Sequence, residues 1–493
     1  MLKNAMHAEK GIDYKERAKE LREQLCTLQL KMKEKSLPAM IVFEGWGASG
    51  KGTLIADTIK LLDPRFFRVV STVEATEAEK RYPRMKRYFE SIPEYGKLAV
   101  MDRSWYRELA AARIEEGISD KEYDRRTRSV KVFERQLTDD GYVIIKIFLH
   151  ISKNEQKKRY EKLQESGSTS WRVTQKDLKQ NKHYDDYYKA FEDMLGKTNT
   201  DNAPWAVIDA TDKQYARYAL FELVTTRLSQ ALDKESVYPP EEDVAKLFDM
   251  KKTPRLSEVV LTDKETAPED YSAKLKELQK ELAKIHGKLY KKKIPVIIAF
   301  EGWDAAGKGG AIKRVGSALD PRGYEAVPIA APSAAEKCRH YLWRFWTRLP
   351  KDGHITIFDR TWYGRVMVER LEGFTPVERC AMAYKEINEF ERELSECGVV
   401  ILKFWMQIDK DEQLRRFTDR MNTPEKRWKI TDEDWRNREK WDQYEAAIDE
   451  MIQKTSTEAA PWTIVEGNDK KYARLKVLET VTERLKAELK DRK

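Results

Sequence analysis

The chain has 493 residues, 41% of them hydrophobic and 36% charged, with a formal net charge of +9 at pH 7. The hydrophobic share is ample for buried cores, and the length fits two large domains or about three of ordinary size. The positive excess is small for a chain of this length, so it permits a polyanionic partner without requiring one.

Cysteine usage and the first residues favour a cytoplasmic protein. The four cysteines form no CxxC pair and show no metal-like spacing with histidine, which argues against a disulfide scaffold. Residues 1–20 lack the apolar core of a signal peptide. The longest apolar runs, such as residues 294–300, are too short to span a bilayer. We therefore expect a soluble protein of the cytoplasm with no membrane partner.

A glycine-rich segment, EGWGASGKGT, occurs at residues 44–53, and a similar one, EGWDAAGKGG, occurs at residues 301–310. A shift of 257 positions, the separation of Lys51 from Lys308, superimposes the two segments. The same shift aligns Asp-Pro-Arg at 63–65 with 320–322, Asp-Arg at 102–103 with 359–360 and Ala-Pro-Trp at 203–205 with 460–462. One register held across both halves predicts a duplicated domain.

The stretch between the two repeats is expected to be a linker. Residues 232–270 are polar, contain proline and are only weakly periodic. This places an N-terminal repeat at residues 1–231 and a C-terminal repeat at residues 271–493. Apolar patches at 244–248 and 259–261 predict that parts of the linker pack against a domain.

In the second repeat, short apolar strands alternate with longer helices. Leucine and isoleucine at helical spacing predict a helix over residues 271–291. A second helix is expected between the glycine-rich loop and Leu319. Strands are expected at 294–300, 354–359 and 399–406. This alternation predicts an α/β fold in which helices cover both faces of a parallel sheet.

The second glycine-rich segment fits the GxxxxGK pattern of a phosphate-binding loop between a strand and a helix. Gly302 and Gly307 let backbone N–H groups curl around phosphate oxygens, and the helix N-terminus adds its positive dipole end. Lys308 supplies a mobile positive charge. Gly309 stands where most such loops place a serine or threonine on Mg²⁺. The alternative interpretation is a simple glycine turn between strand and helix.

Two carboxylates are candidate ligands for Mg²⁺, with Mn²⁺ as the alternative cation. Asp304 lies inside the loop, and Asp359 ends the strand at 354–359, where side chains face the crevice beyond the sheet. Mg²⁺ takes few protein ligands and prefers carboxylates and phosphates. Arg360 could neutralise charge on a migrating phosphoryl group. The alternative is that both aspartates are ordinary solvated loop acids.

Six motifs of the second repeat occur together: GWDAAGKGG, DPRGY, FDRTWYGR, RWKITDEDW, STEAAPW and NDKKYAR. In these motifs and their order the chain resembles the polyphosphate kinase 2 family over nearly all of both repeats. The resemblance implies two tandem phosphate-loop kinase domains of the thymidylate-kinase type, each with a parallel sheet, flanking helices and a helical lid. Two fused repeats resemble the family's second class, which transfers phosphate from inorganic polyphosphate to AMP to give ADP.

The resemblance also implies roles for individual residues. The catalytic set falls on Asp304, Lys308, Asp359 and Arg360. The phosphate-binding set falls on Gly302, Gly307, Gly309, Gly310, Lys313, Arg314 and Arg420. The lid and nucleotide set falls on Trp362, Tyr363 and Arg365, with the lid beginning around Trp362. Gly364 stands where the family usually has asparagine. The aromatic residues at 362 and 363 are expected to pack more than to stack on a base.

A polyphosphate chain requires a groove lined by basic side chains. For each basic residue proposed for this groove, an ordinary solvated surface charge is an equally good interpretation. The candidates are Lys313, Arg314, Lys403, Arg415, Arg416 and Arg420.

The first repeat keeps Lys51, Asp102 and Arg103 but loses other charges of this set. In the shared register it has Gly47 for Asp304, Ala56 for Lys313, Asp57 for Arg314, Glu108 for Arg365 and Leu163 for Arg420. Losing a metal carboxylate and reversing a charge beside the phosphate path should prevent transfer of a polyanion. We therefore predict that the first repeat is a degenerate structural or polyanion-docking domain.

Three alternatives to the AMP reaction stay open. One is phosphorylation of ADP to ATP by polyphosphate, and another is an ATP-dependent nucleoside monophosphate kinase. The basic residues and the missing serine or threonine after Lys308 favour polyphosphate as the donor. The third, a nucleic-acid-associated NTPase, is disfavoured because acids are interspersed among the bases and no nucleic-acid-binding signature occurs. Whether the chain forms a homo-oligomer is left open.

Overall fold

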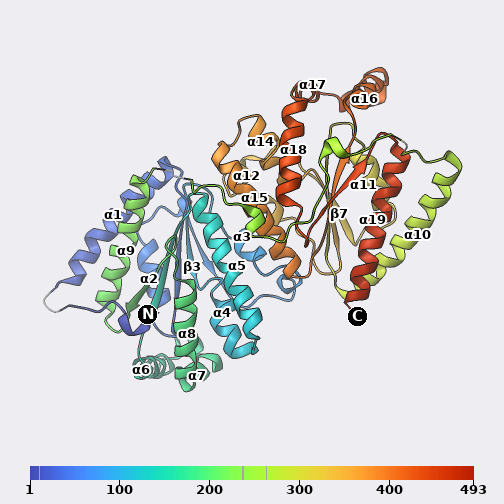
Figure 1. The fold of residues 1–493 in the computed structure, drawn as a ribbon. Helices are drawn as coiled ribbons and strands as arrows, with labels where there is room; N and C mark the ends of the chain where they lie inside the picture. The colour runs from blue at the N-terminus through green and yellow to red at the C-terminus, as the bar shows by residue number, and fades with distance from the viewer. Residues whose placement is uncertain (10–11, 236–237, 263, 493) are drawn as a thin grey trace. The chain divides into compact units, whose positions relative to one another are not determined.

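The structure is a computed structural model that describes residues 1–9, 12–235, 238–262 and 264–492 (Figure 1). The chain forms two compact units. The first consists of Met1–Thr76, Arg87–Val237 and Ala334–His340, and the second of Glu77–Lys86, Tyr238–Ser333 and Tyr341–Lys493. Each unit therefore includes a short segment from the other half of the sequence, so the units are not two contiguous stretches.

The first unit is built on a parallel five-stranded sheet with the order β2-β3-β1-β4-β5. Its strands are β1 (Ala39–Gly45), β2 (Phe67–Ser71), β3 (Leu98–Asp102), β4 (Val143–His150) and β5 (Trp205–Asp209). The helices of this half of the sequence are α1 (Tyr14–Glu34), α2 (Lys51–Ile59), α3 (Lys86–Glu90), α4 (Arg107–Ala111), α5 (Asp120–Asp139), α6 (Lys153–Gln164), α7 (Gln175–Lys182), α8 (Tyr184–Thr198) and α9 (Lys213–Asp233).

The second unit repeats this sheet with the order β7-β8-β6-β9-β10, again all parallel. Its strands are β6 (Val296–Gly302), β7 (Tyr324–Pro328), β8 (Ile355–Asp359), β9 (Val400–Gln407) and β10 (Trp462–Glu466). The helices of this half are α10 (Pro268–Lys292), α11 (Lys308–Gly316), α12 (Ala334–Lys337), α13 (Trp343–Trp346), α14 (Val368–Leu371), α15 (Val377–Glu396), α16 (Lys410–Asn422), α17 (Asp432–Glu439), α18 (Trp441–Thr455) and α19 (Lys470–Asp491).

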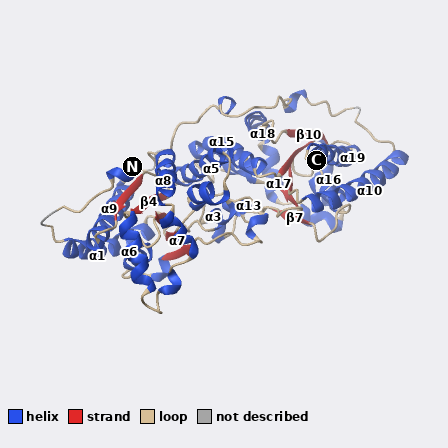
Figure 2. Cartoon of the chain, turned by 90° about the horizontal axis from the view of Figure 1, so that it is seen from below, coloured by secondary structure: helices blue, strands red, loops and turns tan. Residues whose placement is uncertain are grey.

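The two sheets keep the register seen in the sequence. Ala39 begins β1 and Val296 begins β6, a separation of 296 − 39 = 257 residues, and the other four strand pairs have the same separation. The predicted duplication and the α/β fold with parallel sheets are therefore confirmed. In each unit helices surround the strands (Figure 2), which explains why the central strands read as unbroken apolar runs.

A charged pair lies inside each core. Lys403 on β9 and Glu391 on α15 have completely buried side chains, and Lys403 Nζ lies 2.8 Å from Glu391 Oε2. Lys403 also donates to the Tyr363 hydroxyl at 2.7 Å. Lys146 and Glu134 form the same buried pair in the first unit. The prediction that Lys403 lines a groove is therefore wrong, because its ammonium group is satisfied within the core.

Most of the described part of the stretch predicted as a linker belongs to the second unit, whereas its first two residues, 232 and 233, end α9 of the first unit. Met250 forms an antiparallel bridge with Thr457, and the amide of Leu256 donates to Asp449 Oδ1 at 2.8 Å. Val244 and Leu256 are buried. Of the two apolar patches, that at 244–248 contributes a buried side chain, as expected.

Candidate active site

The loop after β6 has the geometry of a phosphate-binding loop. Gly302 has φ +150°, and a Cβ at this position would lie 2.6 Å from Cβ and O of Met406, so only glycine fits. Gly307 has φ +109° and immediately precedes α11, whose first turn contains Gly309 and Gly310. Lys308 Nζ donates to the carbonyl oxygens of Gly302 at 2.5 Å and Trp303 at 3.2 Å. The ammonium group is thus folded back over the loop.

The end of β8 brings a second charged segment beside this loop. Asp359 pairs with Phe300 across the sheet, and the Arg360 amide donates to the Phe300 carbonyl at 3.0 Å. The turn is fixed by buried Glu301, whose Oε1 accepts from the Thr361 amide and hydroxyl, each at 2.7 Å. Parallel strands end at one edge of the sheet, and this is why residues 58 positions apart in sequence, 359 and 301, lie at one site.

The Asp304 carboxylate is held on both oxygens. Arg360 Nη2 lies 3.1 Å from Oδ1, and Asn437 Nδ2 donates to Oδ2 at 3.1 Å. Burial raises the pKa of this carboxyl, but the positive charges of Lys308 and Arg360 outweigh it, so the pKa lies below its usual value. Asp304 is therefore ionised at neutral pH.

The two candidate metal carboxylates differ in how they are held. Asp359 is partly buried, and among the described residues its carboxylate makes no hydrogen bond, so its oxygens are available to a ligand. No group of three or more His, Cys, Asp or Glu within the described ranges could hold a metal ion by itself. Asp304 and Asp359 nevertheless suit Mg²⁺, which binds through one or two carboxylates together with water and substrate phosphates.

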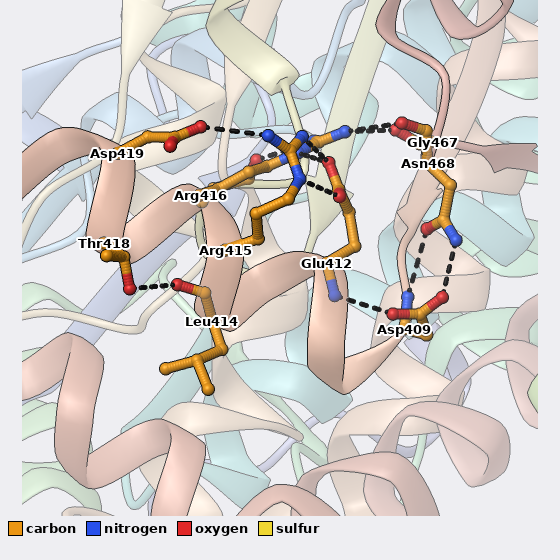
Figure 3. Close-up of polar contacts among 10 residues, drawn as sticks. Asp409, Glu412, Leu414, Arg415, Arg416, Thr418, Asp419, Gly467 and Asn468 are labelled. Atoms are coloured by element: carbon orange, nitrogen blue, oxygen red, sulfur yellow. Dashed lines mark hydrogen bonds and ion pairs between the residues drawn. The ribbon is translucent and has the colours of Figure 1, made fainter.

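Arg416 on α16 contacts two loops at the site, and Figure 3 shows its contacts with Gly467 and Asn468. Its side chain is almost completely buried, and its Nη1 donates to the Ala305 carbonyl at 2.9 Å. Its Nη2 donates to the carbonyls of Gly467 at 2.6 Å and Asn468 at 3.1 Å. A planar guanidinium with five donors is suited to holding several carbonyls at once. Arg416 therefore joins the phosphate loop to the loop after β10, and the prediction that it lines a polyphosphate groove is wrong.

Comparison with known proteins places this site in a family. The family model described as Polyphosphate kinase 2 (PPK2) matches the chain twice, over residues 8–236 and 265–493. The chain belongs to the polyphosphate kinase 2 family. It is 39% identical over 487 residues to a Polyphosphate:AMP phosphotransferase of Pseudomonas aeruginosa, covering 97% of this chain and 96% of that protein. It is 38% identical to a protein of the same name from Acinetobacter johnsonii, covering 91% of each chain.

A solved structure agrees with this assignment. A crystal structure of a polyphosphate kinase 2 from Pseudomonas aeruginosa superimposes with a TM-score of 0.87 at 37% sequence identity, covering 99% of both chains. The tandem arrangement of two polyphosphate kinase 2 domains is therefore shown by sequence and by fold. In the part of the chain that the structure describes, no helix is long and apolar enough to cross a membrane.

The basic residues predicted to bind polyphosphate differ in their exposure to solvent and in whether they are paired within the chain. Lys313 is exposed and Arg314 partly buried on α11, and Arg314 Nη1 donates to the Gly310 carbonyl at 3.2 Å. Arg420 lies at the end of α16 and is partly buried. Arg415 is exposed but paired with Glu412 and Asp419.

The residues predicted for the lid and nucleotide are packed inside the unit. Trp362 and Tyr363 are fully buried, and both donate to Glu391 Oε1. They fit the packing role that the sequence favoured, and neither ring is exposed to stack on a base. Arg365 donates to the Thr375 hydroxyl at 2.6 Å and lies over the Tyr341 ring. A separate helical segment, residues 410–439 with α16 and α17, lies between β9 and α18 (Figure 1), and we call it the helical excursion.

Sequence reasoning missed three residues at this loop: Glu301, Gln413 and Asn437. Gln413 Nε2 donates to the backbone oxygen of Asp304 at 3.2 Å. Glu301 directly precedes the loop, and an acidic residue at the end of an apolar strand was a signal that could have identified it. Gln413 and Asn437 carry no such signal, because they lie 109 and 133 residues from Asp304.

The first repeat also has a glycine-rich loop after its first strand, but its own side chains fill the space beside Gly47. A Cβ built on Gly47 would lie 2.0 Å from the Tyr160 hydroxyl and 3.0 Å from Asp177 Oδ1. Gln180 accepts from the Gly47 amide at 2.9 Å, and Gln156 donates to the Gly47 carbonyl at 3.2 Å. Tyr160 is buried. Side chains of the repeat itself thus occupy the place that the Asp304 carboxylate has in the second repeat.

Proposed function

We propose that this chain transfers the terminal phosphate of inorganic polyphosphate to AMP to give ADP, and that the second repeat performs the reaction. The observation that carries the proposal is the loop of this repeat, where Lys308, Arg360 and the Asp304 carboxylate lie together. The names of near-full-length relatives support the choice of donor and acceptor. We place the reaction in the cytoplasm, because cysteine usage is that of a reducing compartment.

The residues of the second repeat would contribute position and charge, which phosphoryl transfer needs more than covalent chemistry. Backbone N–H groups between Gly302 and Gly310 would hold phosphate oxygens at the start of α11. Lys308 and Arg360 would balance the charge on the phosphate being transferred. Asp304 and Asp359 would hold Mg²⁺, which when bound neutralises charge on the phosphates. Lys313, Arg314 and Arg420 would bind the rest of the polyphosphate chain.

The direct test supplies purified protein with Mg²⁺ and follows nucleotides by chromatography. With polyphosphate and AMP we expect ADP. Two further arms test the alternatives: ATP with AMP reveals an ATP-dependent monophosphate kinase, and polyphosphate with ADP reveals synthesis of ATP. Formation of ADP from ATP and AMP but not from polyphosphate and AMP would refute the proposed donor.

Arg314→Glu is expected to raise the Michaelis constant for polyphosphate more than that for AMP. A rise of about tenfold corresponds to about 1.4 kcal/mol of lost binding. Polyphosphate affinity should also fall with salt, since exposed charges are screened within about 10 Å at 0.1 M. The matched control is Arg322→Glu, the same charge reversal at an exposed residue beyond the far end of α11. Equal effects of the two variants on both substrates would contradict a polyphosphate track along α11.

Gly47→Asp, introduced into Lys308→Ala, is expected not to restore ADP formation. The new side chain would collide with the buried Tyr160 hydroxyl, and Asp57 and Leu163 would remain in place of basic residues. Overpacking should also destabilise the first unit by about 1–3 kcal/mol in urea unfolding. Gly167→Asp is the control, because a Cβ at Gly167 meets nothing within 4 Å. Substantial polyphosphate-dependent ADP formation by the double variant would refute this account of the first repeat.

A further inference from the structure

Asn437 connects the helical excursion to the phosphate loop. It lies on α17, and its Nδ2 donates to Asp304 Oδ2 at 3.1 Å. On its other side, the Tyr444 hydroxyl donates to Asn437 Oδ1 at 3.2 Å. An ionised carboxylate only accepts hydrogen bonds, so the amide nitrogen must face Asp304 and the amide oxygen must face Tyr444. The two contacts thus fix the amide in one orientation.

The hydrogen bond from Asn437 is important because Arg360 holds only one oxygen of the Asp304 carboxylate. Arg360 Nη2 donates to Oδ1 of this carboxylate. The χ2 angle of an aspartate has a broad distribution, so the carboxylate group rotates easily. Without a donor at Oδ2, the carboxylate could turn both oxygens toward Arg360 or Lys308. Asn437 prevents this without adding a positive charge, so it leaves the negative charge available to a cation.

The excursion holds the backbone of Asp304 as well as its carboxylate. Gln413 on α16 donates to the Asp304 carbonyl at 3.2 Å. Arg438, next to Asn437 on α17, donates to the Lys410 carbonyl at 2.5 Å and to Gln413 Oε1 at 3.3 Å. Residues 410–439 therefore contact both the backbone and the carboxylate of Asp304.

The first repeat offers a natural contrast at the matching position, since 437 − 257 = 180. Gln180 also contacts the fourth position of its loop, but it accepts from the Gly47 backbone amide at 2.9 Å. With glycine at position 47 there is no carboxylate to orient. The residue at this position therefore contacts the glycine-rich loop in both repeats. Only in the second repeat does it contact a carboxylate that is a candidate metal ligand.

We propose that Asn437 is a positioning residue that orients the Asp304 carboxylate for the divalent cation and so links the α16–α17 excursion to the metal site. This inference rests on the proposed function, because it takes Asp304 as a cation ligand of that site. Hydrogen-bond partners of metal ligands commonly contribute about 10- to 100-fold to metal affinity or activity.

The test measures binding of Mn²⁺ alone to the full chain by electron paramagnetic resonance, together with the Mg²⁺ dependence of ADP formation. Asn437→Ala and the volume-preserving Asn437→Leu are each expected to weaken Mn²⁺ binding about tenfold. They should raise the Mg²⁺ concentration for half-maximal rate by a similar factor, and the maximal rate should largely return at saturating Mg²⁺. Gln180→Ala is the matched control in the first repeat and should change neither quantity.

Unchanged Mn²⁺ affinity in both Asn437 variants would overturn the inference, whatever their turnover. A lower rate with unchanged Mn²⁺ affinity has the same consequence, because it indicates a merely structural effect. Failure of the proposed function looks different: the unmodified chain would then form no ADP from polyphosphate and AMP. Thermal unfolding of each variant, followed by circular dichroism and compared with the unmodified chain, shows whether the variant is folded during the binding measurement.

Discussion

Lys308→Ala is expected to lower the rate of ADP formation from polyphosphate and AMP at least about 100-fold, the effect of removing one preorganised charge-stabilising group. The ammonium group of Lys308 is folded over the phosphate loop, 2.5 Å from the Gly302 carbonyl, and it would meet the phosphate being transferred. The measurement is the initial rate at saturating polyphosphate, AMP and Mg²⁺.

Lys51→Ala is the matched control and should keep most of the activity. Lys51 makes the same contacts to its loop, with carbonyl distances of 3.0 Å to Gly45 and 2.8 Å to Trp46. Burial and the neighbouring Arg103 lower the pKa of Lys51 to about 8, and Tyr160 occupies the space beside its loop. Similar losses of activity in the two variants would mean that both repeats take part in turnover.

Asp304→Asn and Asp359→Asn are each expected to abolish turnover or to raise the required Mg²⁺ concentration at least about tenfold. Each change keeps the size of the side chain but removes the negative charge that a divalent cation needs. In the first variant Arg360 also loses its ionic partner at 3.1 Å. A Mg²⁺ titration of the initial rate measures the effect, and Mn²⁺ binding to the free protein measures it independently of turnover.

Asp102→Asn provides the control for the second of these variants, because Asp102 ends β3 as Asp359 ends β8. It should leave the Mg²⁺ requirement unchanged if the cation binds in the second repeat alone. Normal rates at low Mg²⁺ in both Asp304→Asn and Asp359→Asn would require that other groups hold the cation.

Much of the fold could be predicted because its signals are local or repeated. A strand, a glycine-rich loop and a helix follow each other directly around Lys308, so the phosphate loop is determined by neighbours in sequence. The register of 257 residues reports the duplication without any knowledge of contacts. Asp359 could be placed near the loop because the carboxyl ends of parallel strands share one edge of a sheet.

Other parts of the site could not be predicted from local sequence. Lys403 looked like a surface cation, yet it is paired with Glu391 in the core, because helices cover both faces of the sheet and every residue of β9 is buried. The lid was expected to begin near Trp362, but Trp362 and Tyr363 are buried in the core, and the helical segment at residues 410–439 follows β9 instead.

The sequence by itself determined the two repeats, the α/β class and the loop carrying Asp304 and Lys308, because each depends on a short stretch or on a repeated pattern. Only the tertiary structure decided which side chains complete each loop. Asn437 reaches Asp304 across 133 residues, and Tyr160 fills the space beside Gly47 across 113 residues (160 − 47). Such partners are brought together by packing of the helices against the sheet. Local periodicity and secondary-structure propensity do not indicate which distant side chain will contact the loop.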